Sequence, residues 1–155
     1  MTYYQPKTLD VAIIEPKPIV DEITVVIPTV GRPILEECLY WIVKGNAWPG
    51  GLIVVDQGRN PQVASWMETL QSLGIAAAYV PSTERGRASG VNRGLERVDT
   101  RYVAVTDDDC FVEKEWLENI VTNLKQYPQA IVTGRVEAGT DNVIVVVTSQ
   151  IPSVQ

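Results

Sequence analysis

The chain has 155 residues, of which 45% are hydrophobic and 21% charged, as is typical of a single globular domain. Its net charge of −6 leaves no basic excess to neutralise a nucleic-acid backbone, so we expect no nucleic-acid partner. Histidine is absent, which excludes a Ser-His-Asp or Cys-His triad, a histidine general base and a histidine-based zinc site.

Strand and helix patterns alternate along most of the chain. Residues 1–22 contain three prolines and no sustained period, so we expect an extended N-terminal arm with a short edge strand at 11–14. Apolar, β-branched runs predict strands over 23–27, 52–55, 75–80, 102–106, 130–136 and 143–147. Helical apolar stripes predict helices over 34–43, 63–73 and 116–124, and the arginine- and glycine-rich segment 84–95 leads into or forms another. Gly50 and Gly51 are predicted to break the chain before the second strand, and Gly74 to cap a helix.

This alternation predicts an α/β domain over residues 23–155. Strands that recur with helices between them require right-handed crossovers, which give a mostly parallel sheet flanked by helices.

Three consecutive aspartates, Asp107, Asp108 and Asp109, follow the apolar run 102–106, which we interpret as a buried strand. Two carboxylates about 4 Å apart repel by about 4 kcal/mol at an effective dielectric constant near 20, so the cluster needs protons, an arginine or a metal ion. Its oxygen ligands favour Mg²⁺ or Mn²⁺. The alternative is a solvated acidic turn.

Polar segments follow each of the first four strands of the predicted sheet. They are residues 29–32, 56–58, 84–95 and 107–109. In a parallel sheet these segments share one edge, where such folds bind ligands. Glycine turns let backbone amides approach a phosphate, and arginine side chains match phosphate oxygens. The residues alone therefore predict a nucleotide-diphosphate site.

Four sequence blocks then carry a family resemblance. They are Val25-Val26-Ile27-Pro28-Thr29 with Arg32-Pro33, Ile53-Val54-Val55-Asp56, Gly86 with Asn92-Arg93-Gly94-Leu95, and residues 102–109 with Trp116-Leu117 downstream. In this order the chain resembles family 2 glycosyltransferases of the GT-A fold from Ile23 to Ala138. The resemblance implies a Rossmann-type sheet and the nucleotide-sugar-binding portion of such an enzyme, without most of the acceptor half.

The resemblance also implies roles for individual residues. Nucleotide-sugar binding falls on Pro28, Thr29, Asp56, Arg85, Arg87, Asn92, Asp107 and Asp108, and metal binding on Asp109 and Asp107. Asp56 would hydrogen-bond the base, residues 87–92 would cover the base and ribose, and Asp109 would hold the metal ion. The alternatives are a turn cap for Asp56, a helix cap or packing role for Asn92, and a solvated loop face for the arginines.

The chain departs from the family pattern in three places. Val30-Gly31 stands where an aromatic residue and an asparagine are common, and Val91 stands where an arginine usually precedes the asparagine. We expect Arg85 or Arg87 to take over that arginine's contact. The family's catalytic carboxylate has no match, since Glu137 and Asp141 lack motif support, so the catalytic residue is unknown.

Two main hypotheses follow. The first is a metal-dependent, inverting transferase that moves a sugar from a nucleotide-diphosphate donor to a saccharide, lipid or protein hydroxyl. The second is the donor-binding module of a truncated or split transferase, without catalysis of its own. A receiver-like phosphate-binding domain is a third reading, which lacks the lysine expected after the fifth strand. Without a membrane-length apolar run or a signal peptide, we expect a cytoplasmic protein, or one peripheral to a membrane, that could form oligomers.

Overall fold

The computed structural model describes residues 5–138 and 144–147. A 3-10 helix at Val11–Ile13 comes first. The strands are β1 (Ile19–Thr29), β2 (Trp48–Asp56), β3 (Ala77–Pro81), β4 (Tyr102–Val105), β5 (Cys110–Val112), β6 (Arg135–Ala138) and β7 (Ile144–Val147). The helices are α1 (Ile34–Val43), α2 (Pro61–Ser72), α3 (Arg87–Leu95) and α4 (Trp116–Gln126). Strands and helices thus alternate from β1 through β4, as the sequence predicts.

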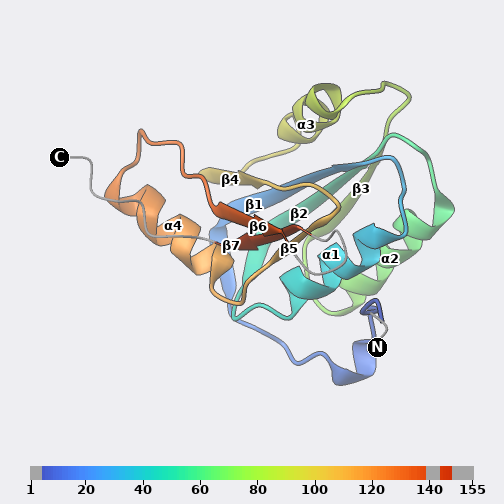
Figure 1. The fold of residues 1–155 in the computed structure, drawn as a ribbon, viewed down its shortest axis with the longest axis horizontal. Coiled ribbons are helices and arrows are strands. Elements are labelled where there is room, and N and C mark those ends of the chain that lie inside the picture. Colours follow the sequence, from blue (N-terminus) through green and yellow to red (C-terminus); the bar gives the residue numbers. More distant parts are fainter. Residues whose placement is uncertain (1–4, 139–143, 148–155) are drawn as a thin grey trace.

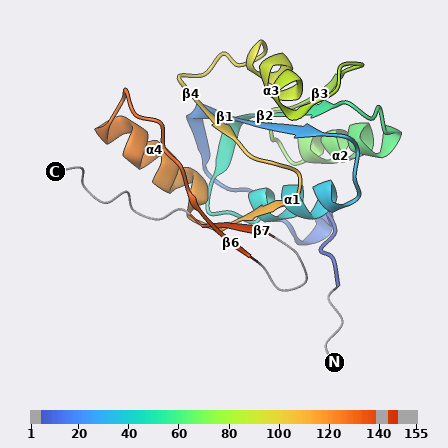
Figure 2. The same ribbon diagram turned by 45° about the horizontal axis from the view of Figure 1, so that its top comes forward.

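The first four strands form one parallel sheet in the order β3-β2-β1-β4, so the predicted mostly parallel sheet is confirmed (Figure 1). Helices cover both faces, with α3 on one side and α1 and α2 on the other (Figure 2). Val25 and Val54 belong to the main core cluster, whereas Val26 and Val55 belong to a second, smaller one. Burial on both faces explains why β1 and β2 are apolar without alternation.

Strand β4 lies at the edge of the described sheet, which corrects the expectation of a fully buried strand. Tyr102 and Ala104 are buried, whereas Val103 and Val105 are 38% and 37% exposed. Because β4 pairs with β1 alone among the described strands, one of its edges and one of its faces are open.

The end of the described chain differs most from the prediction. The strand expected over 130–136 begins only at Arg135, as β6, and β5 directly after the acidic triplet is a strand that the sequence pattern did not reveal. Strand β7 pairs parallel to β5 and antiparallel to β6 in a separate three-stranded sheet. The expected strand 143–147 corresponds to β7, with residue 143 outside the described residues.

Two further predictions near the N-terminus are wrong. The edge strand expected at 11–14 is a 3-10 helix, and β1 begins at Ile19, inside the predicted arm.

The glycine pair expected to break the chain before the second strand is also placed differently, because Gly50 and Gly51 lie within β2. The pairing of β1 with β2 shifts register between Val20 and Thr24, where a Cβ on Gly50 would stand 2.6 Å from the Asp21 carbonyl oxygen. Glycine therefore permits a close backbone approach at this irregularity.

Helix ends follow local rules. Asn60 Oδ1 accepts a hydrogen bond from the Gln62 amide at 3.1 Å and caps α2. At the other end Gly74 has φ +94°, and the Ile75 amide donates to the Leu70 carbonyl at 3.2 Å, as in a Schellman cap. No helix in residues 5–138 has both the length and the apolar character needed to cross a membrane.

Candidate functional site

The carboxyl ends of the four parallel strands meet at one edge of the sheet. The register pairs Thr29 with Asp56 and Asp56 with Pro81, and β4 runs parallel to β1 on its other side. The segments after β1, β2, β3 and β4 therefore converge as predicted.

A hollow of about 380 Å³ lies at this edge. Its lining consists of Pro28, Thr29, Val30, Arg32, Gln57, Gly86, Arg87, Asp107, Asp108 and Asp109. The structure thus brings together six of the predicted site residues, namely Pro28, Thr29, Arg87 and the three acids. Asp56, Arg85 and Asn92 are not part of this lining.

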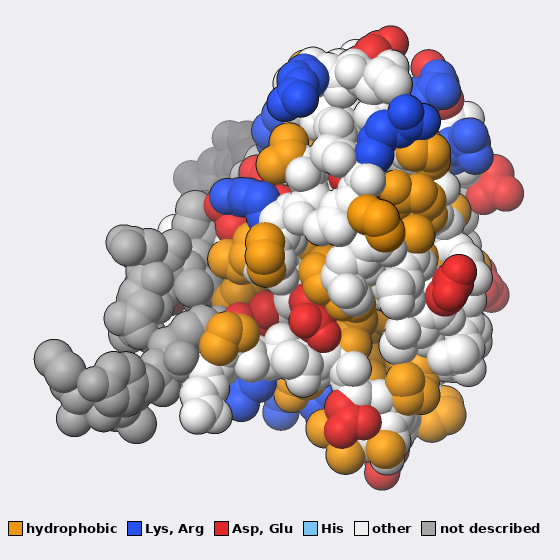
Figure 3. All heavy atoms as spheres, turned by 90° about the vertical axis from the view of Figure 1, so that its right-hand side faces the viewer, with side chains coloured by type: hydrophobic (Ala, Val, Ile, Leu, Met, Phe, Trp, Pro, Cys, Tyr) orange, Lys and Arg blue, Asp and Glu red, His pale blue; other side chains and the backbone are white. Residues whose placement is uncertain are grey.

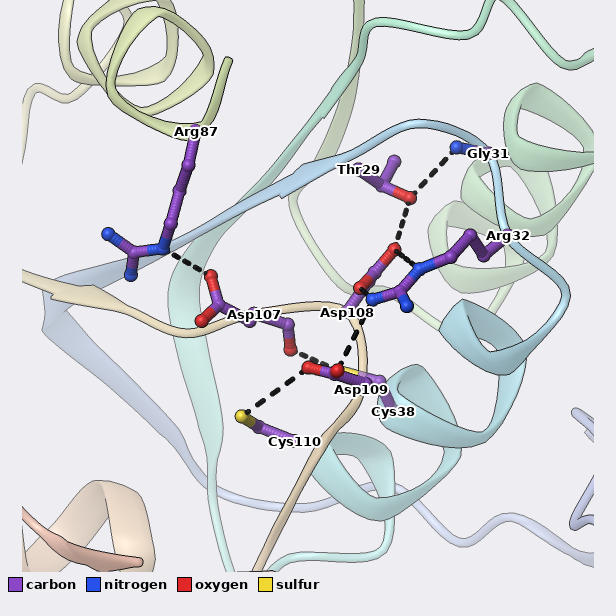
Figure 4. A network of polar contacts seen from close by, with 9 residues as sticks. All are labelled: Thr29, Gly31, Arg32, Cys38, Arg87, Asp107, Asp108, Asp109 and Cys110. Carbon is purple, nitrogen blue, oxygen red and sulfur yellow. Dashed lines mark hydrogen bonds and ion pairs between the residues drawn. The ribbon is translucent and has the colours of Figure 1, made fainter. Parts of the chain in front are cut away.

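Asp108 is the buried member of the acidic triplet, at 4% exposure. Thr29 Oγ1 donates a hydrogen bond to Asp108 Oδ2 at 2.7 Å, and Arg32 Nε donates to the same oxygen at 3.2 Å. Arg32 Nη2 also pairs with Asp108 Oδ1 and lies 3.3 Å from Asp109 Oδ2 (Figure 4). These contacts raise the pKa of Arg32 further above its usual value, mainly through the hydrogen bond to Asp108. The Arg32 guanidinium therefore neutralises Asp108, the buried acid.

The turn after β1 directs Arg32 toward the acids. Thr29 Oγ1 accepts the Gly31 amide at 3.0 Å while donating to Asp108. Gly31 has φ +86°, and a Cβ there would stand 2.7 Å from Asn60 Cβ. Both the conformation and the space require glycine, which gives a structural reason for the Val30-Gly31 departure noted in the sequence.

Asp107 is paired from above by α3. Arg87 Nε donates to Asp107 Oδ1 at 2.6 Å (Figure 4). The start of α3 is held by Gln57, whose Nε2 donates to the carbonyl oxygens of Glu84 at 3.0 Å and Gly86 at 2.8 Å. Gln57 is only 8% exposed, so this contact fixes the backbone beside Arg87.

Asp107, Asp109 and Cys110 form a group whose possible ligand atoms all lie within 4.8 Å of one another. Cys110 Sγ donates to Asp109 Oδ1 at 3.9 Å, and burial, the largest cause, raises the pKa of its thiol. A cysteine sulfur is a soft ligand, which suits Zn²⁺ or Cu⁺ better than Mg²⁺ or Mn²⁺. The two carboxylates alone are the hard oxygen donors that fit Mg²⁺ or Mn²⁺.

Asp56 is fully buried and its carboxylate is engaged within the protein. Oδ1 accepts the Gly58 amide at 2.9 Å, and Oδ2 accepts the Asn60 amide at 2.7 Å and the Tyr79 hydroxyl at 3.0 Å. Burial first, and then this hydrogen bond, raise the pKa of Tyr79. The carboxylate organises the loop after β2, which is the turn-cap role weighed as an alternative.

Helix α3 places its arginines and glycines on different sides. Gly90 and Gly94 are its buried residues, and a Cβ on Gly94 would stand 2.4 Å from Val26 Cγ1. These glycines therefore allow close packing on the sheet, and only Gly86 lines the hollow. Arg85 and Asn92 are exposed. Lys and Arg side chains gather where α3 lies, at the top of the face in Figure 3.

Four residues of the lining were not among the predicted site residues, namely Val30, Arg32, Gln57 and Gly86, and of these Arg32 and Gln57 make side-chain contacts in the site. Arg32 contacts an acid 76 positions away in the chain, and no local pattern predicts that pairing. The position of Arg32, three residues after the end of β1, was the signal that could have identified it, because polar residues that follow parallel strands converge at one edge of the sheet. Gln57 directly follows β2 and could have been found in the same way.

A second, larger hollow adjoins the first. It measures about 610 Å³ and is lined by β4, α4 and residues 128–136, with Arg87 and Asp107 shared between the two linings. Two buried hydroxyl oxygens that border it, Tyr102 Oη and Thr106 Oγ1, have no hydrogen-bond partner among the described residues.

The fold agrees with what sequence comparison finds. The family described as glycosyl transferase family 2 matches residues 24–150, and the chain belongs to this family. A curated relative, "Glycosyltransferase GlyA" of Streptococcus pneumoniae serotype 4 (strain ATCC BAA-334 / TIGR4), is 23% identical over 115 residues. That match covers 74% of this chain but only 16% of the relative. The chain therefore corresponds to a small part of that protein's length.

Proposed function

We propose that this chain binds a nucleoside-diphosphate sugar and supports transfer of the sugar to an acceptor hydroxyl. The observation that carries the proposal is the hollow at the carboxyl edge of the parallel sheet, where three acids, two arginines and Thr29 meet in a family 2 glycosyltransferase. Such an edge is where open α/β sheets bind ligands, and arginine suits phosphate oxygens.

A divalent cation, Mg²⁺ or Mn²⁺, completes the proposed donor site. Asp107 and Asp109 would hold it, because their oxygens converge and remain partly exposed. When bound, the ion would neutralise charge on the leaving diphosphate. Asp108 is excluded from this role because Thr29 and Arg32 occupy its oxygens.

The proposed transfer inverts the anomeric carbon. The bond from that carbon to the diphosphate oxygen breaks, a bond to the acceptor oxygen forms, and the acceptor's proton passes to a base. The acceptor is a saccharide, lipid or protein hydroxyl. We place the transferase domain at residues 23–155 and the chain in the cytoplasm or at a membrane surface.

A second candidate function is donor binding without independent catalysis. Among the described residues that line the two hollows, the acids are Asp107, Asp108 and Asp109, all of which pair with arginine. Neither lining includes Glu137, and Asp141 lies outside the described residues. A separate base would then be supplied by another segment or chain.

Asp109→Ala tests the donor site. We expect the variant to lose Mn²⁺-dependent binding of a nucleoside diphosphate while its stability stays within about 0.5 kcal/mol of wild type, since Asp109 is partly exposed and like-charge repulsion is relieved. Isothermal calorimetry and urea unfolding would measure both quantities, with the exposed Asp99→Ala as a charge-matched control. Unchanged Mn²⁺-dependent binding in Asp109→Ala would refute the site.

Transfer assays on the purified chain separate the two candidate functions. Sugar transfer to an acceptor by the chain alone supports an enzyme, whereas donor binding without turnover supports a binding module.

A further inference from the structure

The two arginines that neutralise the acidic triplet have different surroundings. The Asp108 side chain beside Arg32 is 5% exposed and also accepts the Thr29 hydroxyl. The Arg87 and Asp107 side chains are 61% and 40% exposed, and they meet at the border of the two hollows (Figure 4). The Arg32 side chain is itself 49% exposed, so the first pair has one buried member, Asp108, whereas both members of the second pair are exposed to solvent.

The pair between Arg87 and Asp107 can open at little cost. An ion pair between exposed side chains changes an equilibrium constant by no more than about fivefold. The backbone beside Arg87 is nevertheless fixed, because Gln57 holds the carbonyl oxygens of Glu84 and Gly86 and Gly90 packs on Pro28. The guanidinium can therefore turn to a new partner while α3 stays in place.

Asp107 can pair with two positive groups, the Arg87 guanidinium and a divalent cation. Its carboxylate accepts Arg87 in this structure and belongs with Asp109 to the donor set that fits a divalent cation. A divalent ion and a guanidinium on one carboxylate repel each other, so binding of the ion displaces Arg87. The released guanidinium remains at the lining of the smaller hollow, where it would meet the donor's diphosphate.

We propose that Arg87 is an exchangeable ligand: it neutralises Asp107 in the free protein and binds the diphosphate once a cation occupies Asp107 and Asp109. This inference rests on the proposed function. Arg87 then opposes cation binding and favours diphosphate binding, so the two ligands bind with positive coupling through it. Arg32 is excluded from such exchange because its partner Asp108 is buried and also held by Thr29.

The exchange predicts effects of opposite sign from a single substitution. In the full chain, Arg87→Gln should bind Mn²⁺ alone about two- to fivefold more tightly, because a competitor for Asp107 is gone. At saturating Mn²⁺ it should bind nucleoside diphosphates about tenfold or more weakly, because a charged phosphate ligand is lost. Electron paramagnetic resonance of free Mn²⁺ measures the first affinity, and calorimetry with ADP, GDP, UDP, CDP and dTDP measures the second.

Arg97→Gln is the matched control, since it removes the same charge from an exposed side chain that follows α3 and lies outside the hollow. It should change each affinity by less than about twofold. Arg87→Lys keeps the charge but not the planar fork, so its Mn²⁺ affinity should stay near wild type while diphosphate affinity falls to an intermediate value.

The outcomes separate the exchange from the donor site itself. If Arg87→Gln leaves Mn²⁺ affinity unchanged or weakens it, or if Arg97→Gln strengthens it equally, the exchange is wrong even where the wild type binds a nucleoside diphosphate. If the wild type binds none of the five with Mn²⁺, the proposed function fails and the exchange fails with it. Opposite shifts in Arg87→Gln alone support the exchange.

Discussion

Asp108 and Asp109 are neighbours in the chain but have different surroundings. The Asp108 side chain is 5% exposed and bonded to Thr29 and Arg32, whereas the Asp109 side chain is 35% exposed and contacts Arg32 at 3.3 Å. The sequence predicted that the triplet needs neutralising groups, but it could not distinguish the buried acid from the two partly exposed acids that we propose bind a cation. Burial decides that question, and burial depends on residues far away in the chain.

Asp108→Ala should lower the free energy of unfolding by about 1–3 kcal/mol, because Thr29 and Arg32 lose a buried partner. Asp108→Asn should lower it less, since an amide oxygen can still accept the Thr29 hydroxyl. Urea unfolding measures both, beside Asp109→Ala as the partly exposed neighbour. Wild-type stability in Asp108→Ala would contradict the buried role.

Cys38 predicts a pH dependence of stability. Full burial, and then electrostatic interactions with Cys110 and the nearby acids, raise the pKa of its thiol well above the ordinary value. The unfolded chain ionises Cys38 above about pH 8.5, whereas the folded chain keeps it protonated. Stability is therefore complete below that pH and falls as pH rises above it.

Urea unfolding between pH 7 and pH 10 should show a steeper loss of stability in wild type than in Cys38→Ala. Equal slopes would mean that this thiol does not contribute. The alanine variant is expected to be less stable at every pH because of the cavity it leaves, so the slopes are compared and not the absolute values.

Helix α3 shows how an element positions the site. Gly90 and Gly94 lie one turn apart and bring the helix backbone close to Pro28 and Val26 of β1. The sequence suggested that glycines in this segment expose amides to a phosphate, and only Gly86 lies where it could do so. Helical spacing of the other two was the available clue to packing.

Gly94→Ala should destabilise the protein by about 1–3 kcal/mol, because the new methyl group overlaps Val26. It should also weaken diphosphate binding, since α3 carries Arg87. Leu95→Ala, at a 40% exposed position on the same helix, is the control and should change stability by less than about 0.5 kcal/mol. A neutral Gly94→Ala would show that the helix can shift without cost.

The remaining elements divide by the range of their interactions. The strands β1 to β3 and the helices α1, α2 and α4 follow apolar periodicity, and the sequence predicted them with shifts at their ends. Strand β5 has three residues, too few for a period, and it pairs with β7, which lies more than 30 residues away in the chain. Pairing across such separations leaves no local pattern to read.

At the scale of the whole molecule, parallel strands bring four separate polar segments to one edge. The sequence predicted that convergence from strand order alone, and the register of β1 with β2 and β4 confirms it. It left two roles open for Asp56, base binding and a turn cap, and could not decide between them because the cap depends on Asn60 and Tyr79 reaching the same oxygen. The strand topology therefore determines where the site lies, and packing determines which side chains there can contact a ligand.

In the proposed site, Asp107 and Asp109 coordinate a cation beside a nucleoside diphosphate at this edge. A crystal of the full chain grown with Mn²⁺ and a nucleoside diphosphate tests it most directly, through the anomalous signal of manganese. We predict an anomalous peak coordinated by Asp109 and Asp107 and by diphosphate oxygens, with Arg87 turned from Asp107 to the phosphates. A nucleotide bound elsewhere, or bound at this edge with no ion on these carboxylates, would contradict the account.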